Sequence, residues 1–250
     1  MVAAYIRADT CIFGAKGLYC RAMQFNASLF SSVLMSSAWL LTGVLLLTAL
    51  RQAPWRLLLA VPLRQHALFA ALALQGLIWS FQVEVVPGFH CHLSLTVTLT
   101  LVFGWSFALV GGAIVALLVI VTGRADLQAV PLDWLLSVLL PATLAYWLMR
   151  ALYRLRLRNL FFYILGLGFF GTIAVTFVVC CAVWLLLGAT QAPLFMADLW
   201  EKSAVVVPLL YAEGFLNGVL VTAITVFVPD LVKTFDDHHF LDRDGPDPPA

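Results

Sequence analysis

The stretch HLSLTVTLTLVFGWSFALVGGAIVALLVIVT, residues 92–122, decides how many helices of the chain are long enough to cross a lipid bilayer. As one helix the stretch would be about 46 Å long, at about 1.5 Å per residue, whereas the hydrocarbon core of a bilayer is about 30 Å thick. Gly104 and Trp105 lie in its middle, and Gly111 and Gly112 follow. The stretch is therefore either one strongly tilted helix or two shorter elements that turn near Gly104.

The composition indicates a membrane protein. Hydrophobic residues make up 63% of the chain and charged residues 11%, whereas about a quarter of a soluble domain is charged. Apolar runs of about 20 residues recur, each long enough to cross a bilayer as a helix. We predict an all-α, polytopic integral membrane bundle with about seven (six or seven) transmembrane helices in a lipid bilayer. The predicted spans are residues 29–50, 67–86, 92–122 (one or two crossings), 132–153, 160–187 and 203–228.

The basic residues select between these counts, because cytoplasmic loops are enriched in lysine and arginine. With seven crossings, nine basic residues lie on one side and five on the other. The nine are Arg51, Arg56, Arg64, Arg150, Arg154, Arg156, Arg158, Lys233 and Arg243, and the five are Arg7, Lys16, Arg21, Arg124 and Lys202. A single crossing by residues 92–122 would place the two arginine-rich loops on opposite sides. We therefore predict seven crossings, an outside N-terminus, a cytoplasmic C-terminus, and residues 89–93 at the outer face.

The chain divides into three parts. Residues 1–22 form an N-terminal extension that carries three basic residues and has no clear amphipathic period. Residues 23–230 form the transmembrane domain, and residues 231–250 form a polar cytoplasmic tail whose composition is typical of disorder. Met23 begins MQFNASLFSS directly before the first span. We predict that Met23 is the true start, which would sharpen the charge asymmetry.

Several function classes are excluded by the sequence. The net charge of +1 provides no general attraction to nucleic acid. Cys180 and Cys181 are neighbours in an apolar run and point apart on a helix, so the five cysteines do not indicate a disulfide framework. The sequence contains no GxSxG, HExxH or P-loop pattern. We therefore predict no catalytic residues, no enzyme activity and no permanently bound cofactor; an intramembrane enzyme is the weakest alternative.

Glu213 stands out among the polar residues within the spans, because ionisable groups at this depth are costly and often functional. Asn217 lies four residues later, on the same helix face. Gly214 and Gly218 form a GxxxG pattern that lets another helix approach closely. Glu213 either forms a hydrogen bond to neighbouring backbone within a packing helix, or is a polar lock near a substrate cavity or a partner interface.

Residues 89–93, FHCHL, contain three potential metal ligands: His90, Cys91 and His92. Glu84 precedes them, either as a ligand or counter-charge for the same outer site or as a side chain that reaches the interface. His66, on the inner side, is expected to have a structural or interfacial role. Asp236–His239 has ligand chemistry, but such a charged run is usually a solvated tail.

Three groups of motifs suggest a family. In the first group, His92 and Leu93 are followed by Gly104 and Trp105. In the second, PLDW at 131–134 leads to LPA at 140–142. In the third, AEG at 212–214 is followed by VTA at 221–223 and PDL at 229–231. In order and spacing these motifs, between Met23 and Leu241, resemble the substrate-capture permease of energy-coupling factor transporters, in the cobalt/nickel CbiM/NikM-like family. The closing VKTFDDHHFL is similar to a subgroup of predicted bacterial membrane proteins within that family.

The resemblance implies seven helices, an outside N-terminus, a bacterial inner membrane location and capture of a divalent transition-metal ion from the outer face. It implies three metal ligands: the N-terminal amine, a histidine at position two and a histidine that opens the third helix. His92 matches the last of these. Position two is Val2, or Gln24 if the chain starts at Met23, and neither is histidine.

His90 and Cys91 could replace the missing ligand. Imidazole binds nickel, cobalt, copper and zinc, and thiolate favours copper(I) or zinc. His90 and His92 would face the same side on an extended loop but point about 200° apart on a helix. Pro87 and Gly88 favour the extended loop. The alternative is that His92 is a polar loop residue bonded to backbone.

Two functions follow. The first is a transport subunit, for which the resemblance implies a transmembrane coupling protein and cytoplasmic ATPase subunits as partners and a transition-metal ion as substrate. The basic loop at Arg150–Arg158 is then either a docking surface or an anchor for lipid headgroups. The second is a non-transport assembly or metal-delivery factor for a membrane enzyme.

Overall fold

The computed structural model describes residues 25, 27–122, 127–155, 160–228 and 231–232. The predicted extension at residues 1–22, the proposed start at Met23, and Gln24 lie outside these ranges. Arg124, Arg156, Arg158 and the tail from residue 233, including Asp236–His239, also lie outside them.

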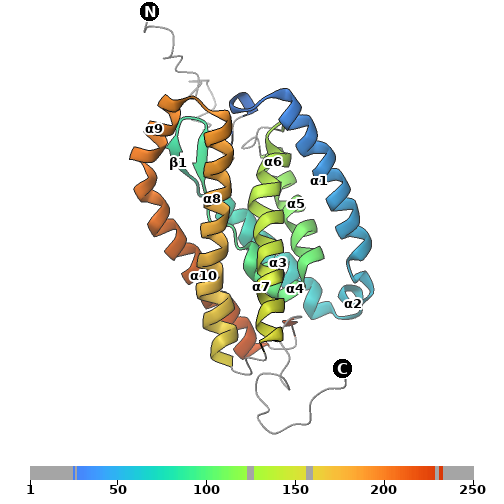
Figure 1. The fold of residues 1–250 in the computed structure, drawn as a ribbon. Helices are drawn as coiled ribbons and strands as arrows, with labels where there is room; N and C mark the ends of the chain where they lie inside the picture. The colour runs from blue at the N-terminus through green and yellow to red at the C-terminus, as the bar shows by residue number, and fades with distance from the viewer. Residues whose placement is uncertain (1–24, 26, 123–126, 156–159, 229–230, 233–250) are drawn as a thin grey trace, which may run out of the picture.

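The described chain is a bundle whose long helices run back and forth along one axis (Figure 1). It begins with η1 (Ala27–Leu29), α1 (Ser32–Gln52), α2 (Trp55–Ala60), α3 (Pro62–Trp79), β1 (Val83–Val86) and β2 (Phe89–Cys91). It continues with α4 (Thr96–Phe103), α5 (Trp105–Val121), α6 (Val130–Trp134), the π-helical η2 (Leu135–Leu139) and α7 (Leu140–Arg154). It ends with the π-helical η3 (Phe162–Gly171), α8 (Thr172–Thr190), α9 (Pro193–Glu201), η4 (Ser203–Val205) and α10 (Val206–Phe227).

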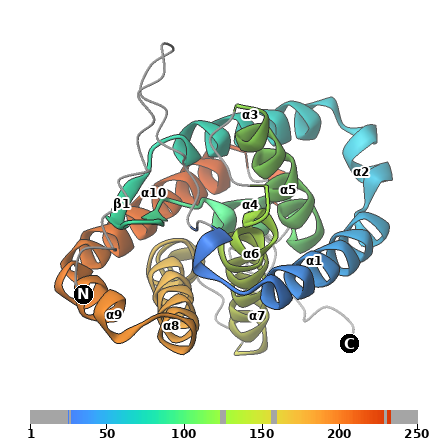
Figure 2. The same ribbon diagram turned by 90° about the horizontal axis from the view of Figure 1, so that it is seen from above.

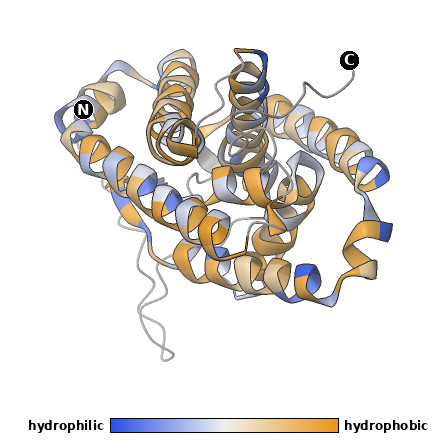
Figure 3. Cartoon of the chain, turned by 90° about the horizontal axis from the view of Figure 1, so that it is seen from below, coloured by the Kyte–Doolittle hydropathy of each residue, from blue (hydrophilic) through white to orange (hydrophobic). Residues whose placement is uncertain are grey.

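Four helices in the described ranges are long and apolar enough to cross a membrane: Ser32–Gln52, Val130–Arg154, Phe162–Thr190 and Ser203–Phe227. Trp105–Val121 is a shorter apolar helix. The outer faces of the bundle are largely hydrophobic (Figure 3), and Leu40, Leu185 and Phe215 are 74%, 76% and 66% exposed. Soluble monomers rarely expose such extensive apolar surface. The prediction of a helical membrane protein is confirmed, whereas the count of seven crossings stays a prediction.

Residues 92–122 form two helices, α4 and α5, and not one. Gly104 separates them with a φ of 89°, which glycine adopts without the steric cost of a Cβ atom. Every residue of α4 is buried, and Figure 2 shows α4 in the interior of the bundle. The predicted turn near Gly104 is therefore confirmed. With eight residues, α4 is about 12 Å long and shorter than a bilayer core.

A β-hairpin replaces the end of the second predicted span. α3 ends at Trp79, and β1 pairs antiparallel with β2. Pro87 and Gly88 form the connection, and the φ of Gly88 is 86°, as the second central residue of a type II turn requires. The prediction of helix to Val86 was wrong here, and the all-α bundle carries this two-stranded hairpin in addition to its helices. The β-branched valines before a Pro-Gly turn favour a hairpin.

The hairpin and α9 lie at one end of the bundle, which we call the hairpin end (Figure 1). α1 and α7 each finish at the opposite end, and they carry Arg51 and Arg154 in their last turns. Phe25, the first described residue, forms an isolated antiparallel bridge with Phe89. Their rings stack with centroids 5.3 Å apart, so the start of the described chain is joined to the hairpin.

α10 packs closely on η3 and α8 at two glycines. A methyl group on Gly214 would lie 2.5 Å from Cγ1 of Ile173 and 3.2 Å from the carbonyl oxygen of Phe169. A methyl group on Gly218 would lie 3.2 Å from Cβ of Phe169. The glycines thus allow the helices to approach at a distance that a larger residue would prevent.

Gly214→Ala is expected to lower the free energy of unfolding by about 1–3 kcal/mol, because the added methyl overpacks a rigid contact. Gly43→Ala is the matched control in α1, since a methyl there meets nothing within 4 Å. The control should gain about 0.5–1 kcal/mol of helix stability. Denaturant unfolding in detergent micelles measures both, and equal unfolding midpoints for the two variants would contradict the packing argument.

Candidate functional site

The centre of the site is the loop that joins β2 to α4. Leu95 precedes α4 with a φ of 56°, a left-handed conformation that costs a non-glycine residue about 1–2 kcal/mol. The buried carboxylate of Glu213 accepts hydrogen bonds from the backbone N–H of Ser94 (2.7 Å) and of Leu95 (3.1 Å). Glu213, in α10, thus bonds the backbone N–H of the N-cap residue Leu95, as the glutamate of a capping box does from within its own helix. The two contacts hold the loop in its strained conformation.

Asn217 extends this arrangement by one helical turn. Its Oδ1 accepts hydrogen bonds from the backbone N–H of Thr98 (3.0 Å) and from the Thr98 hydroxyl (2.6 Å). Its Nδ2 donates to the backbone carbonyl and to Oε1 of Glu213, both at 2.9 Å. Glu213 and Asn217 are both buried. The pair therefore accepts hydrogen bonds from three backbone N–H groups at the start of α4. Two belong to the loop before the helix, and the third, that of Thr98, is the donor that an N-cap side chain usually bonds.

The backbone carbonyl of Ser94 is held from the opposite side by α3. Gln75 Nε2 donates to it at 3.0 Å, and Trp79 Nε1 donates at 3.3 Å. Gln75 is fully buried. Ser94 therefore has its N–H bonded to α10 and its carbonyl bonded to α3, so the loop connects two helices that are far apart in the sequence.

A π-helical segment provides a third anchor. Pro141 cannot donate a hydrogen bond to the Ser137 carbonyl four residues earlier, and η2 lies directly before it. The hydroxyls of Ser94 and Thr96 lie 3.0 and 3.1 Å from that carbonyl oxygen, and 2.6 Å from each other. The irregular helix thus exposes a carbonyl to the loop, as such segments often do at functional sites.

The three predicted ligands in residues 89–93 lie in different environments. His92 packs on Trp79 with ring centroids 4.9 Å apart, and its Nδ1 lies 3.1 Å from the Leu93 carbonyl oxygen. His90 faces Glu84 across the hairpin, with His90 Nε2 4.0 Å from Glu84 Oε1. Cys91 ends β2 between them. Within the described ranges, no three or more His, Cys, Asp or Glu side chains gather as a metal-holding group.

Burial determines the protonation of His92 and Cys91, the two predicted ligands nearest the loop, which lie outside the four candidate spans. It lowers the pKa of His92 to about 4, and the hydrogen bond to Leu93 opposes this only in part. His92 is therefore neutral near pH 7, the form that binds metal ions. Burial, with a smaller contribution from Cys180, raises the pKa of Cys91 to about 12. Its thiol is therefore protonated near pH 7, and a metal ion would have to displace that proton to bind the sulfur.

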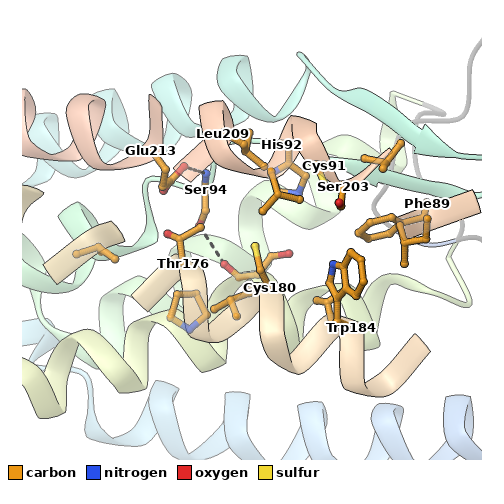
Figure 4. Close-up of a pocket in the computed structure, with 18 residues that line it drawn as sticks. Phe89, Cys91, His92, Ser94, Thr176, Cys180, Trp184, Ser203, Leu209 and Glu213 are labelled. Carbon is orange, nitrogen blue, oxygen red and sulfur yellow. Dashed lines mark hydrogen bonds between the residues drawn. The ribbon is translucent and has the colours of Figure 1, made fainter. Parts of the chain in front are cut away.

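An open pocket lies between the hairpin, the Ser94 loop, α8 and α10 (Figure 4); its empty space, including the part that is open to solvent, is about 770 Å³. His92, Cys91 and Glu213 line it, whereas His90 lies on the hairpin against Glu84. Most of the other lining side chains are apolar, including Val179, Val183 and Trp184. A largely apolar cavity with a few convergent polar groups is the usual form of a small-ligand site.

Sequence reasoning missed several residues of this site. Cys180 lines the pocket from α8, although the sequence indicated only that it and Cys181 point apart. Gln75, Ser94 and Thr98 make the contacts that fix the loop. The sequence could have indicated Gln75, because an amide side chain inside an apolar span needs a hydrogen-bond partner when it is buried.

Comparisons with known proteins are consistent with this architecture. A crystal structure of a truncated transition metal transporter superposes with a TM-score of 0.65 at 13% identity, covering 83% of this chain and 99% of that one. A crystal structure of a transition metal transporter gives 0.61 at 14% identity, covering 84% and 93%. At these identities the likeness shows the fold alone. A search of curated proteins gave no match.

One family model matches residues 25–231, and it is described as the cobalt uptake substrate-specific transmembrane region. The match includes the hairpin, the Ser94 loop, the pocket, and the α10 residues Glu213 and Asn217. Because the matched residues make up most of the sequence, the chain belongs to the CbiM family, the cobalt uptake substrate-specific transmembrane region.

Proposed function

We propose that this chain is the substrate-capture subunit of an energy-coupling factor type ABC transporter, which takes up a transition-metal ion at its outer face. The family match and the shared fold of two transition metal transporters support uptake of such an ion. The resemblance implies the cobalt/nickel class. The observation that carries the proposal is His92: its neutral imidazole lines a pocket next to a loop that Glu213 and Asn217 hold in place.

We further propose seven crossings of a bacterial inner membrane, with the N-terminus outside and the C-terminus in the cytoplasm. Arg51 and Arg154 lie at the same end of the bundle, opposite the hairpin (Figure 1). By the distribution of basic residues, that end would be cytoplasmic. The hairpin end, with the pocket, would then face outward. Cysteine labelling of intact cells at residue 84, with residue 52 as the cytoplasmic control, tests the orientation.

A second metal ligand is proposed at the start of the chain. The resemblance implies the N-terminal amine, and Phe25 is bridged to Phe89 on the hairpin. Phe89 lines the pocket. If translation starts at Met23, that amine belongs to the residue two positions before Phe25 in the sequence. Intact-mass measurement of the membrane-inserted protein tests the start; a mature chain that begins at residue 1 or 2 contradicts it.

Transport requires partners, since the sequence has no nucleotide-binding motif. We propose a transmembrane coupling protein and cytoplasmic ATPase subunits. The alternative, an assembly or metal-delivery factor, predicts a membrane enzyme as the partner. Gentle purification from the native membrane separates the two, because ATPase and coupling subunits would co-purify only with a transporter.

His92→Ala is expected to weaken binding of Ni²⁺ or Co²⁺ by at least about 10–100-fold, the loss that even an indirect change at a metal site causes. His66→Ala removes an exposed histidine of α3 and is the matched control. Titration of the purified chain in detergent measures both. Equal affinities for wild type and His92→Ala would remove His92 from the site.

A further inference from the structure

Two cysteines that are distant in sequence line the same pocket. Cys91 ends β2, Cys180 lies in α8, and both are free thiols. In Figure 4 the Cys180 side chain extends from α8 toward the side of the pocket that holds His92 and Cys91. Both side chains thus line one pocket, Cys91 from the hairpin and Cys180 from α8. Cys181, the next residue along α8, is exposed on the outside.

The surroundings of this pair favour a soft ion. Val97, Val179 and Val183 give the pocket an apolar wall. The Glu213 carboxylate also lines it, but both of its oxygens already accept hydrogen bonds from the Ser94 loop. Thiolates are soft ligands that favour copper(I) or zinc over harder ions. Copper(I) is stable with two sulfur ligands, whereas zinc, nickel and cobalt ions take four or more ligands. Two thiols that line one pocket therefore match the ligand number of copper(I) better than that of zinc, nickel or cobalt.

We propose that Cys91 and Cys180 form a two-thiolate site that binds copper(I) in this pocket. The proposal goes beyond the cobalt/nickel class that the resemblance implies, and it rests on the proposed function only in placing a captured ion in the same pocket. On binding, each thiol loses its proton to solvent and its sulfur becomes a ligand. The ion then links β2 to α8.

Anaerobic titration of the reduced, full-length chain with copper(I) against a chromogenic copper(I) chelator tests the site. Cys11 and Cys20 lie outside the described residues and are replaced by serine in every sample, so that they contribute no thiol. Cys91→Ser and Cys180→Ser should each weaken copper(I) binding by at least about 100-fold, more than the loss of an outer-shell partner causes. Cys181→Ser, the adjacent exposed thiol, should bind as the parent does.

X-ray absorption at the copper edge provides a readout that a loss of fold cannot imitate, since the parent should show two sulfur neighbours. Three outcomes would each overturn the proposal. The affinity could be unchanged in both pocket variants, or copper could be bound only by nitrogen or oxygen. The third is a Cys91–Cys180 disulfide that forms in place of the complex. The same samples are titrated with Ni²⁺ and Co²⁺. If these ions bind with no copper(I) site, this inference fails and the proposed function stands; if no metal ion binds, both fail.

Discussion

Glu213→Ala is expected to lower the free energy of unfolding by about 3–6 kcal/mol. The change leaves the backbone N–H groups of Ser94 and Leu95, now 2.7 and 3.1 Å from the carboxylate, without an acceptor inside the bundle. Each buried donor that loses its partner costs about 1–3 kcal/mol. Asn217 Nδ2 also loses one of its two acceptors. The strained conformation of Leu95 then loses the contacts that maintain it.

Denaturant unfolding in micelles, followed by tryptophan fluorescence, measures this loss. Glu213→Gln keeps one acceptor oxygen but directs an amide donor toward backbone donors, so it should fall between wild type and Glu213→Ala. Glu201→Ala, at an exposed position in α9, is the control and should change the stability by less than about 0.5 kcal/mol. If Glu213→Ala has the same free energy of unfolding as the Glu201→Ala control, the carboxylate does not hold the loop.

Asn217→Asp is expected to lower the free energy of unfolding by about 2–4 kcal/mol although it replaces only one non-hydrogen atom, the Nδ2 nitrogen, by oxygen. Asn217 Nδ2 donates to Glu213 Oε1 at 2.9 Å, and an oxygen in its place repels the neighbouring carboxylate. A hydrogen bond to a charged group contributes about 1.5–3 kcal/mol, and repulsion adds to its loss. The acceptor for Thr98 is retained, so the effect isolates the Glu213–Asn217 contact.

The same unfolding experiment, with Gln52→Glu as the exposed amide-to-acid control, measures this effect. The double variant Glu213→Gln with Asn217→Asp reverses donor and acceptor and restores one hydrogen bond between the two side chains. Its destabilisation should therefore be smaller than the sum of the single changes, which is the sign of direct coupling. Strict additivity would show that the two side chains do not act as a unit.

Much of the fold could be predicted from local patterns. Apolar length located the long helices, and Gly104 marked a break that the structure places at φ 89°. The four-residue spacing of Glu213 and Asn217 indicated a shared face, and the two side chains are hydrogen-bonded. The hairpin was missed although its signal was present: valines before Pro87 and Gly88 were counted by hydrophobicity as helix. Hydrophobicity alone does not separate a buried strand from a helix end.

The site could be predicted only in part, because its contacts join distant segments. Glu213 and Ser94 are 119 residues apart in the sequence, and nothing local to Glu213 indicates that its partners are backbone N–H groups of a loop. Ser137 contributes a carbonyl whose availability depends on Pro141 and a π-helical segment. Cys180 enters the pocket because of the rotation of α8, which the nearly uniform hydrophobicity of that helix does not specify.

The position of the bound ion tests the central claim, which is that the chain captures a transition-metal ion in the pocket beside His92. Crystals of the full-length chain grown with Ni²⁺ or Co²⁺ would be measured at the absorption edge of the metal for anomalous scattering. We predict an anomalous peak within coordination distance of the His92 imidazole, and its loss in His92→Ala crystals. A peak confined to Asp236–His239 of the tail, or anywhere else outside this pocket, would contradict the account.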